Sequence, residues 1–122
     1  MFEKIKQKSV VKSYLMKLSL ELFSRFGKKH HYTIDEVTHT VEAAGFKVEH
    51  LVYAHALYCD RKDFRRFYKR SDQRERYDAL REEVSGRYFG GVRDFDAANI
   101  IEAVRSLEID PHFYESGPRV SG

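Results

Sequence analysis

FKVEHLVYAHALYC, residues 46–59, is the stretch of this sequence that decides the fold. On a helical wheel its apolar side chains are distributed over every side. They are Val48, Leu51, Val52, Ala54, Leu57 and Tyr58. A helix that is apolar all round has no side for solvent and is therefore buried. We expect residues 48–59 to form the central helix of the protein.

Two helices are predicted before this segment. Thr33 and Glu36 in YTIDEV, residues 32–37, have the spacing of a capping box, so a helix should begin there, cover residues 34–44 and stop at Gly45. An earlier helix should end at Gly27. Its main apolar stripe is Val11, Tyr14, Leu15, Leu18, Leu22 and Phe26. A second stripe of Met16, Leu20 and Phe23 lies on another side, so this helix must be covered from two directions.

Three helices are predicted after the central segment. Asp60 can cap the first of them, and Ser71 can cap a second that should stop at Gly86. The last should begin at Asp96 and end before Pro111. The cap and stop signals thus divide the second half of the chain into three helices.

These elements predict an all-α fold, a compact single domain of five or six helices around the central apolar helix. Residues 1–110 should form this domain, and residues 111–122, which are polar and contain glycine, should form a mobile C-terminal tail. The scarcity of helix breakers, with two prolines in 122 residues, agrees with a helical fold. The residues expected in the core are Val41, Leu51, Leu57, Leu80 and Val104.

The single cysteine, Cys59, excludes an internal disulfide and any metal site built from several cysteines. It fits a reducing cytoplasm. The first residues are not expected to be a secretory signal, because Lys17 and Glu21 interrupt the apolar segment and no small-residue cleavage site follows. No stretch is long enough to span a bilayer.

The net charge of +3 conceals an alternation, because residues 1–31 and 61–76 are basic and residues 32–60 and 77–122 are acidic. In RKDFRRFYKR, residues 61–70, helical spacing should turn Phe64, Phe67 and Tyr68 toward the core. The opposite side would then carry Arg61, Lys62, Arg65, Arg66, Lys69 and Arg70. This basic face could bind nucleic acid or phosphate without sequence preference, or it could be a solvated surface compensated by the acidic blocks, which is the interpretation we favour.

No catalytic, metal or cofactor site is predicted. Among the six histidines no pair has the i, i+4 spacing of metal ligands on a helix. His55 is expected to be a hydrogen-bonded core residue and Cys59 a buried small side chain. An enzyme that uses His55 and Cys59 is a third hypothesis, which neighbours from elsewhere in the fold would have to complete.

The leading hypothesis is a non-enzymatic module for protein–protein interaction or self-association. It rests on the second stripe of the first helix, because Met16, Leu20 and Phe23 could form a surface for a protein partner or for a second copy. The alternative is that both stripes are covered by the protein's own helices.

TIDEVTHTVEAAGFKVEHLVYAHALYC, residues 33–59, and YDALREEVSGRYFGGVRDF, residues 77–95, resemble a family of small uncharacterised bacterial proteins, a domain of unknown function. The resemblance extends over about residues 10–108 and is most specific at YAHALYC. It implies a bacterial, cytoplasmic setting and no activity, cofactor or catalytic residue.

Overall fold

The computed structural model describes residues 2–92 and 94–109, and every regular element in these ranges is helical. The α-helices are α1 (Phe2–Ser13), α2 (Ser19–Phe26), α3 (Ile34–Ala43), α4 (Leu51–Tyr58), α5 (Arg61–Phe67), α6 (Tyr77–Tyr88) and α7 (Ala97–Ile109). A π-helical turn, η1 (Tyr14–Leu18), joins α1 to α2, and a 3-10 turn, η2 (Arg74–Arg76), precedes α6. Since α1, η1 and α2 are continuous, the described part has six helices, and the all-α prediction is confirmed. The tail predicted at residues 111–122 lies outside the described residues.

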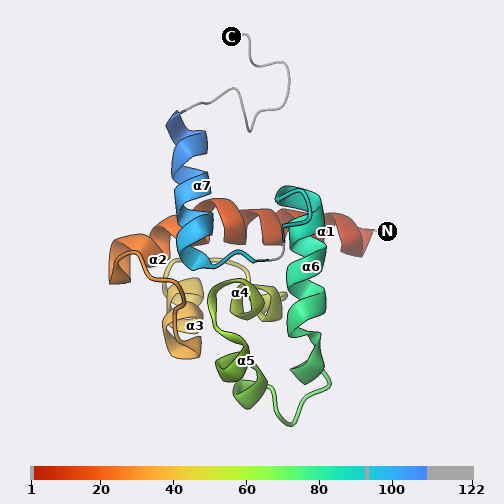
Figure 1. The fold of residues 1–122 in the computed structure, drawn as a ribbon. Helices are drawn as coiled ribbons and strands as arrows, with labels where there is room; N and C mark the ends of the chain where they lie inside the picture. The colour runs from red at the N-terminus through yellow and green to blue at the C-terminus, as the bar shows by residue number, and fades with distance from the viewer. Residues whose placement is uncertain (1, 93, 110–122) are drawn as a thin grey trace.

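Helix α4 lies in the middle of the fold, with the α1–α2 helix, α3, α5 and α6 around it (Figure 1). Six consecutive residues, from Tyr53 to Tyr58, are buried. Because side chains on all sides of α4 are apolar, each neighbouring helix can cover one part of it. The prediction of a central apolar helix is therefore confirmed.

The start of α4 differs from the prediction. A Schellman motif ends α3, since the Phe46 N–H donates to the Val41 carbonyl at 2.9 Å and Gly45, at φ +80°, donates to Glu42 at 3.3 Å. This motif turns the chain before a new helix can form. Val48 consequently lies outside α4 and is 51% exposed, so the predicted start at residue 48 is wrong.

The carbonyl end of α4 is satisfied by groups from other elements. The Tyr32 N–H donates to the Tyr58 carbonyl at 2.7 Å, and the Tyr77 hydroxyl donates to the Cys59 carbonyl at 2.9 Å. Arg81 donates from Nη1 to the Ala56 carbonyl at 3.0 Å. The last carbonyls of a helix have no partner within it, so a buried helix end needs such donors.

Three of the predicted helix starts are confirmed. Thr33 and Glu36 form the expected capping box, with both hydrogen bonds at 3.0 Å. Asp60 accepts from the Asp63 N–H at 3.1 Å, and Asp96 accepts from the Asn99 N–H at 2.9 Å. Local side-chain chemistry was sufficient to locate these starts.

The predicted limits of α6 are wrong. Ser71 accepts from the Gln73 N–H at 3.0 Å within a turn, and the α-helix begins at Tyr77. Gly86 is an ordinary helical residue. The left-handed conformation occurs instead at Gly90 and Gly91, where the Gly91 N–H donates to the Ser85 carbonyl at 3.0 Å. The helix therefore ends at Tyr88, two residues later than expected.

Four of the five predicted core residues are buried. Val41 and Leu57 are 0% exposed, and Leu80 and Val104 are nearly so, whereas Leu51, in the first turn of α4, is only half-buried. The centre of α4 therefore belongs to the core, whereas its first turn lies at the edge of the core.

Leu57→Ala should lower the free energy of unfolding by about 2–5 kcal/mol, because the lost side chain leaves a cavity in the core. Urea denaturation followed by circular dichroism measures the change. Val48→Ala is the matched control, since half of that side chain is exposed, and should change stability by less than about 0.5 kcal/mol. Equal effects of the two substitutions would contradict the central position of α4.

Candidate functional site

A groove of about 500 Å³ opens beside the π-helical turn, and we call it the π-turn groove. Its lining comes from four elements: Met16 and Lys17 of η1, Leu20 and Glu21 of α2, Ala44 and Phe46 after α3, and Val104 of α7. Five of these side chains are apolar, and one cation and one anion are among them. The groove can therefore receive an apolar side chain that has charged neighbours of both signs.

Hydrogen bonds between distant segments join two walls of the groove, the π-helical turn and the loop after α3. The Tyr58 hydroxyl donates to the Tyr14 carbonyl at 2.6 Å, inside the π-helical turn. The Tyr14 hydroxyl donates in turn to the Lys47 carbonyl at 2.5 Å, next to Phe46. Burial raises the pKa of Tyr14 to about 12, so this hydroxyl keeps its proton at neutral pH. The turn that carries Met16 and the loop that carries Phe46 are thus tied to each other.

The structure separates the three residues of the predicted partner surface. Met16 and Leu20 line the π-turn groove, whereas Phe23 lies under the Arg105 guanidinium, 5.0 Å from the ring centroid. All three are half-buried against the core, and α7 packs on this side of α2. The protein's own helices therefore cover part of the second stripe, and the groove is the part that stays open.

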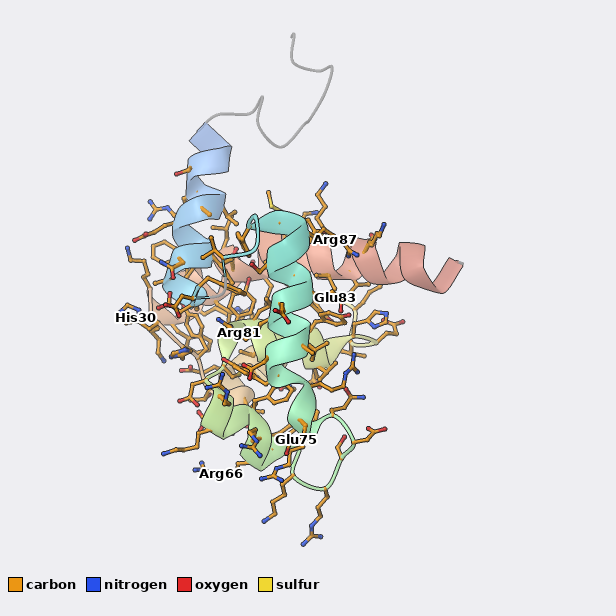
Figure 2. All side chains as sticks on the ribbon, turned by 45° about the vertical axis from the view of Figure 1, so that its right-hand side comes forward. His30, Arg66, Glu75, Arg81, Glu83 and Arg87 are labelled. Carbon is orange, nitrogen blue, oxygen red and sulfur yellow. The ribbon has the colours of Figure 1, made fainter. Side chains whose placement is uncertain are left out.

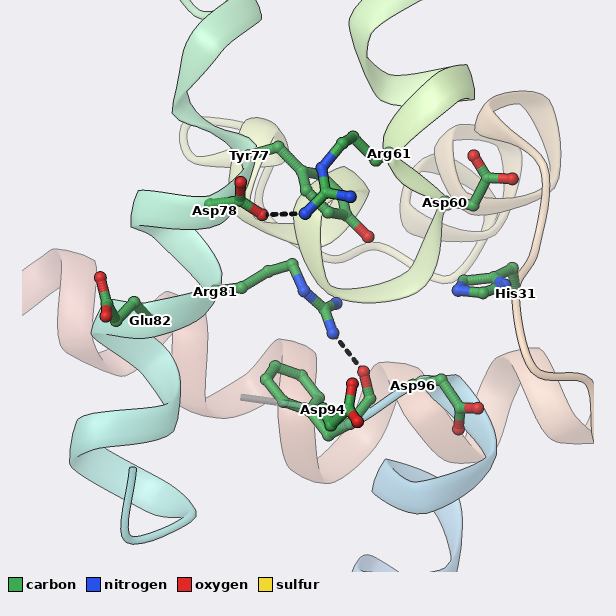
Figure 3. A pocket seen from close by; sticks show the side chains of 10 residues that line it. His31, Asp60, Arg61, Tyr77, Asp78, Arg81, Glu82, Asp94 and Asp96 are labelled. Carbon is green, nitrogen blue, oxygen red and sulfur yellow. Dashed lines mark hydrogen bonds and ion pairs between the residues drawn. The ribbon is translucent and has the colours of Figure 1, made fainter. Parts of the chain in front are cut away.

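A larger cavity of about 610 Å³ lies between α5, α6 and the start of α7 (Figure 3). It is lined by His31, Asp60, Arg61, Tyr77, Asp78, Arg81, Glu82, Asp94, Phe95 and Asp96. Carboxylates outnumber cations in this lining. Among the described residues, however, no three His, Cys, Asp or Glu side chains are arranged to hold a metal ion.

Arg81 forms the inner wall of this cavity. Its guanidinium donates to the carbonyls of Ala56 and Phe95 and lies over the Phe95 ring at 4.1 Å and the Tyr77 ring at 5.2 Å. A cation at the carbonyl end of α4 also suits the helix dipole. The contacts of Arg81 are those of a residue that joins α4, α6 and the start of α7. No sequence pattern points to Arg81, because its partners are backbone carbonyls far along the chain.

The predicted basic face is partly neutralised by ion pairs. Arg61 meets Asp78 at 2.5 Å, Arg65 meets Glu75 at 2.9 Å, and Arg66 meets Asp63 at 3.5 Å. Arg66 and Glu75 are at the α5 end of the molecule in Figure 2. Lys62, Lys69 and Arg70 are exposed, and no carboxylate in the described residues pairs with them. Carboxylates of the described residues thus pair with three of the six cations of the basic face.

The prediction that all three aromatic side chains of this segment face the core is wrong for Phe67. Phe64 is buried and Tyr68 half-buried, whereas Phe67 is 56% exposed. Phe67 is the last residue of α5, and at about 3.6 residues per turn a residue four positions after Phe64 lies nearer to the side of Phe64 than a residue three positions after it. Tyr68 occupies the inner position instead, with its hydroxyl 2.7 Å from His55 Nδ1.

His55 is a buried, hydrogen-bonded residue, as predicted. Its other ring nitrogen, Nε2, lies 2.8 Å from Thr38 Oγ1, and Phe67 covers the ring edge-on with 5.3 Å between centroids. Burial lowers the pKa of His55 to about 4 and raises the pKa of the Cys59 thiol well above its usual range. Neither side chain lines the π-turn groove or the larger cavity.

A family of unknown function, DUF6559, matches residues 2–115. The chain belongs to this family. The match includes all the described helices and both cavities, and it agrees with the resemblance seen in the sequence. Comparison with curated proteins and with solved structures finds no significant match. Within the part that the structure describes, no helix of this DUF6559 chain combines the length and the apolar composition needed to cross a bilayer.

Arg81→Lys should lower the free energy of unfolding by about 2–3 kcal/mol, because an ammonium group cannot reach the carbonyls of α4 and Phe95 together. Chemical denaturation measures the change. Arg61→Lys is the matched control in the same cavity, since Arg61 is an exposed partner of Asp78, and it should change stability by less than about 0.5 kcal/mol. A neutral Arg81→Lys variant would show that the guanidinium contacts are dispensable.

Protonation of His55 should destabilise the protein in acid. The pKa of His55 is about 4 in the folded state against 6.5 for an unperturbed side chain. The unfolded state therefore takes up this proton first. The stability that neutral His55 contributes is complete above pH 6.5 and is lost as the pH falls toward 4, to a total of about 3 kcal/mol.

Urea denaturation between pH 7 and pH 5 tests this expectation. His55→Gln can still form hydrogen bonds with Thr38 and Tyr68 but does not titrate, so its stability should vary less over this range. Equal slopes for the two proteins would assign the acid sensitivity to other groups.

Proposed function

We propose that the protein is a non-enzymatic helical interaction module in which a second copy of the chain docks on the π-turn groove. The observation that supports this most directly is the groove itself, in which an apolar floor from Met16 and Leu20 lies beside Lys17 and Glu21, one helical turn apart. A surface of this kind is apolar at its centre and charged at its rim, as protein interfaces are.

The charges of the rim are self-complementary. In a two-fold contact, if a first residue of one copy meets a second residue of the other copy, the same two residues also meet with the copies exchanged. If the α1–α2 helices of two copies cross antiparallel with the axis midway between Lys17 and Glu21, Lys17 of each copy meets Glu21 of the other. Glu21 already accepts from Arg25 at 3.2 Å in an exposed ion pair, which leaves its second carboxylate oxygen for Lys17.

The apolar side chains suit the same arrangement. Met16 and Leu20 of one copy would enter the space beside Phe46 and Val104 of the other. Methionine is unbranched and adapts its shape to a neighbour at low cost. A π-helical turn inside a longer helix is, in addition, often found at functional sites. The groove therefore combines an adaptable centre with a rim that matches a second copy of itself.

The two other hypotheses have less support as the main function. Half of the basic face is already paired with carboxylates, so nucleic-acid binding rests on the remaining cations. An enzyme based on His55 and Cys59 would need a buried imidazole held by two hydroxyl groups and a thiol whose pKa is raised. We also propose a cytoplasmic, bacterial setting, because Cys59 is a free, buried thiol and the family resemblance points the same way.

Sedimentation velocity should show a species of twice the chain mass of 14.4 kDa that gives way to monomer on dilution. Lys17→Glu should weaken dimerisation about tenfold, because two attractive contacts become repulsive in a two-fold interface. Lys17→Glu combined with Glu21→Lys should restore it, since the charges are exchanged and the complementarity is kept.

The matched control is Val92→Asp, at an exposed apolar residue outside the groove. It should leave the dimer unchanged, whereas Leu20→Asp should abolish it. A monomer at all concentrations contradicts the proposal, as does a dimer that is indifferent to all the groove substitutions. Lys17→Glu and the double exchange alter exposed side chains, so they remain informative even if Leu20→Asp unfolds the protein.

A further inference from the structure

The exposed side of α5 and the residues just after it combine a solvent-exposed aromatic ring with cations that have no carboxylate partner in the described residues. Lys62, Lys69 and Arg70 are exposed and unpaired within the described residues, and Phe67 between them in sequence is 56% exposed. We call these four residues the α5-end surface. It is separate from the π-turn groove, since the two share no residue.

The Phe67 ring is fixed although it is exposed. It packs against Tyr68 and His55, with ring centroids 4.8 and 5.3 Å away and interplanar angles of 87° and 73°. Neither neighbour is stacked parallel to Phe67. A ring that is already held loses little conformational freedom when a flat ligand stacks on it. The described residues have two other large exposed apolar side chains, Val48 and Val92, and neither is aromatic.

Internal ion pairs decide which charges remain for a ligand. The Arg61 and Arg65 side chains lie against Asp78 and Glu75, at 2.5 and 2.9 Å. These ion pairs neutralise the charges of the basic face that lie nearest to α6 and the turn before it. The cations that remain are Lys62 in the first turn of α5 and Lys69 and Arg70, which follow Phe67 within three residues, and their positive charge is complementary to a polyanion.

We propose that the α5-end surface binds single-stranded nucleic acid, with phosphates against Lys62, Lys69 and Arg70 and a base stacked on Phe67. Unpaired bases expose their faces to an aromatic ring, whereas a duplex hides them. An anionic membrane offers the same negative charge but would gain little from the insertion of one phenylalanine. Contacts with base edges are not part of the site, so sequence preference is not expected.

Fluorescence anisotropy with fluorescein-labelled oligo(dT) and oligo(rU) tests the proposal, with a DNA duplex of equal length and vesicles of phosphatidylcholine and phosphatidylserine as the competing ligands. The single strands should bind more tightly than the duplex. With three phosphate contacts, the affinity should fall about 20-fold between about 50 and about 200 mM salt.

Two variants separate the parts of the site. Reversing Lys62, Lys69 and Arg70 to Glu should abolish binding. Phe67→Leu keeps an apolar side chain against Tyr68 and His55 but removes the ring, and should weaken binding roughly tenfold without changing the salt dependence. Circular dichroism verifies that each variant is folded.

The matched control reverses Lys8, Lys12 and Arg87, three exposed residues of α1 and α6, and so changes the net charge equally. Arg87 lies far from Arg66 in Figure 2. This control should keep the affinity within about twofold. Equal losses in the two triple variants, an unchanged Phe67→Leu, tighter binding of duplex or vesicles, or no binding at low salt would each overturn the proposal. None of these results depends on whether the protein dimerises through the groove.

Discussion

The fold depends on the burial of a short helix together with its carbonyl end. Helix α4 has eight residues, and the carbonyls of its last turn have no partner within the helix. In an apolar core each of them would cost free energy if it were left without a donor. Arg81, the Tyr77 hydroxyl and the Tyr32 N–H provide these donors. The requirement brings α6 and the loop before α3 to the same end of α4.

The same principle applies at the π-helical turn. An extra residue in a helical turn disturbs the regular hydrogen-bond ladder, and Tyr58 donates its hydroxyl to the Tyr14 carbonyl at that point. The Tyr14 hydroxyl in turn donates to the Lys47 carbonyl. A buried helix, a widened turn and a loop are thereby joined by two tyrosines. The groove lies beside this connection, and α7, which packs on α2, contributes Val104 to its lining.

Sequence reasoning found what is encoded locally. The capping box at Thr33 and the caps at Asp60 and Asp96 depend on atoms within three residues, and the apolar wheel of α4 needs no knowledge of its neighbours. The errors arise where a local signal competes with distant contacts. Gly86 resembles a helix stop, yet α6 continues to Tyr88. The turn that follows is closed by two hydrogen bonds, from the Gly91 N–H to the Ser85 carbonyl and from the Ser85 hydroxyl to the Val92 carbonyl.

The candidate sites follow the same division. The stripe containing Met16 and Leu20 can be read from helical spacing, whereas the opposite walls from Phe46 and Val104 require the fold. Phe67 was misplaced because Tyr68, four residues after Phe64, takes the inner position beside His55. The tyrosine hydroxyls that tie the core together also set a limit at high pH. Burial raises the pKa of Tyr14, Tyr58 and Tyr77, so unfolding releases protons from them once the medium becomes strongly alkaline. A phenolate cannot donate a hydrogen bond to a carbonyl. Strong alkali should therefore break these hydrogen bonds cooperatively, and the ultraviolet absorbance of tyrosinate reports the ionisation directly.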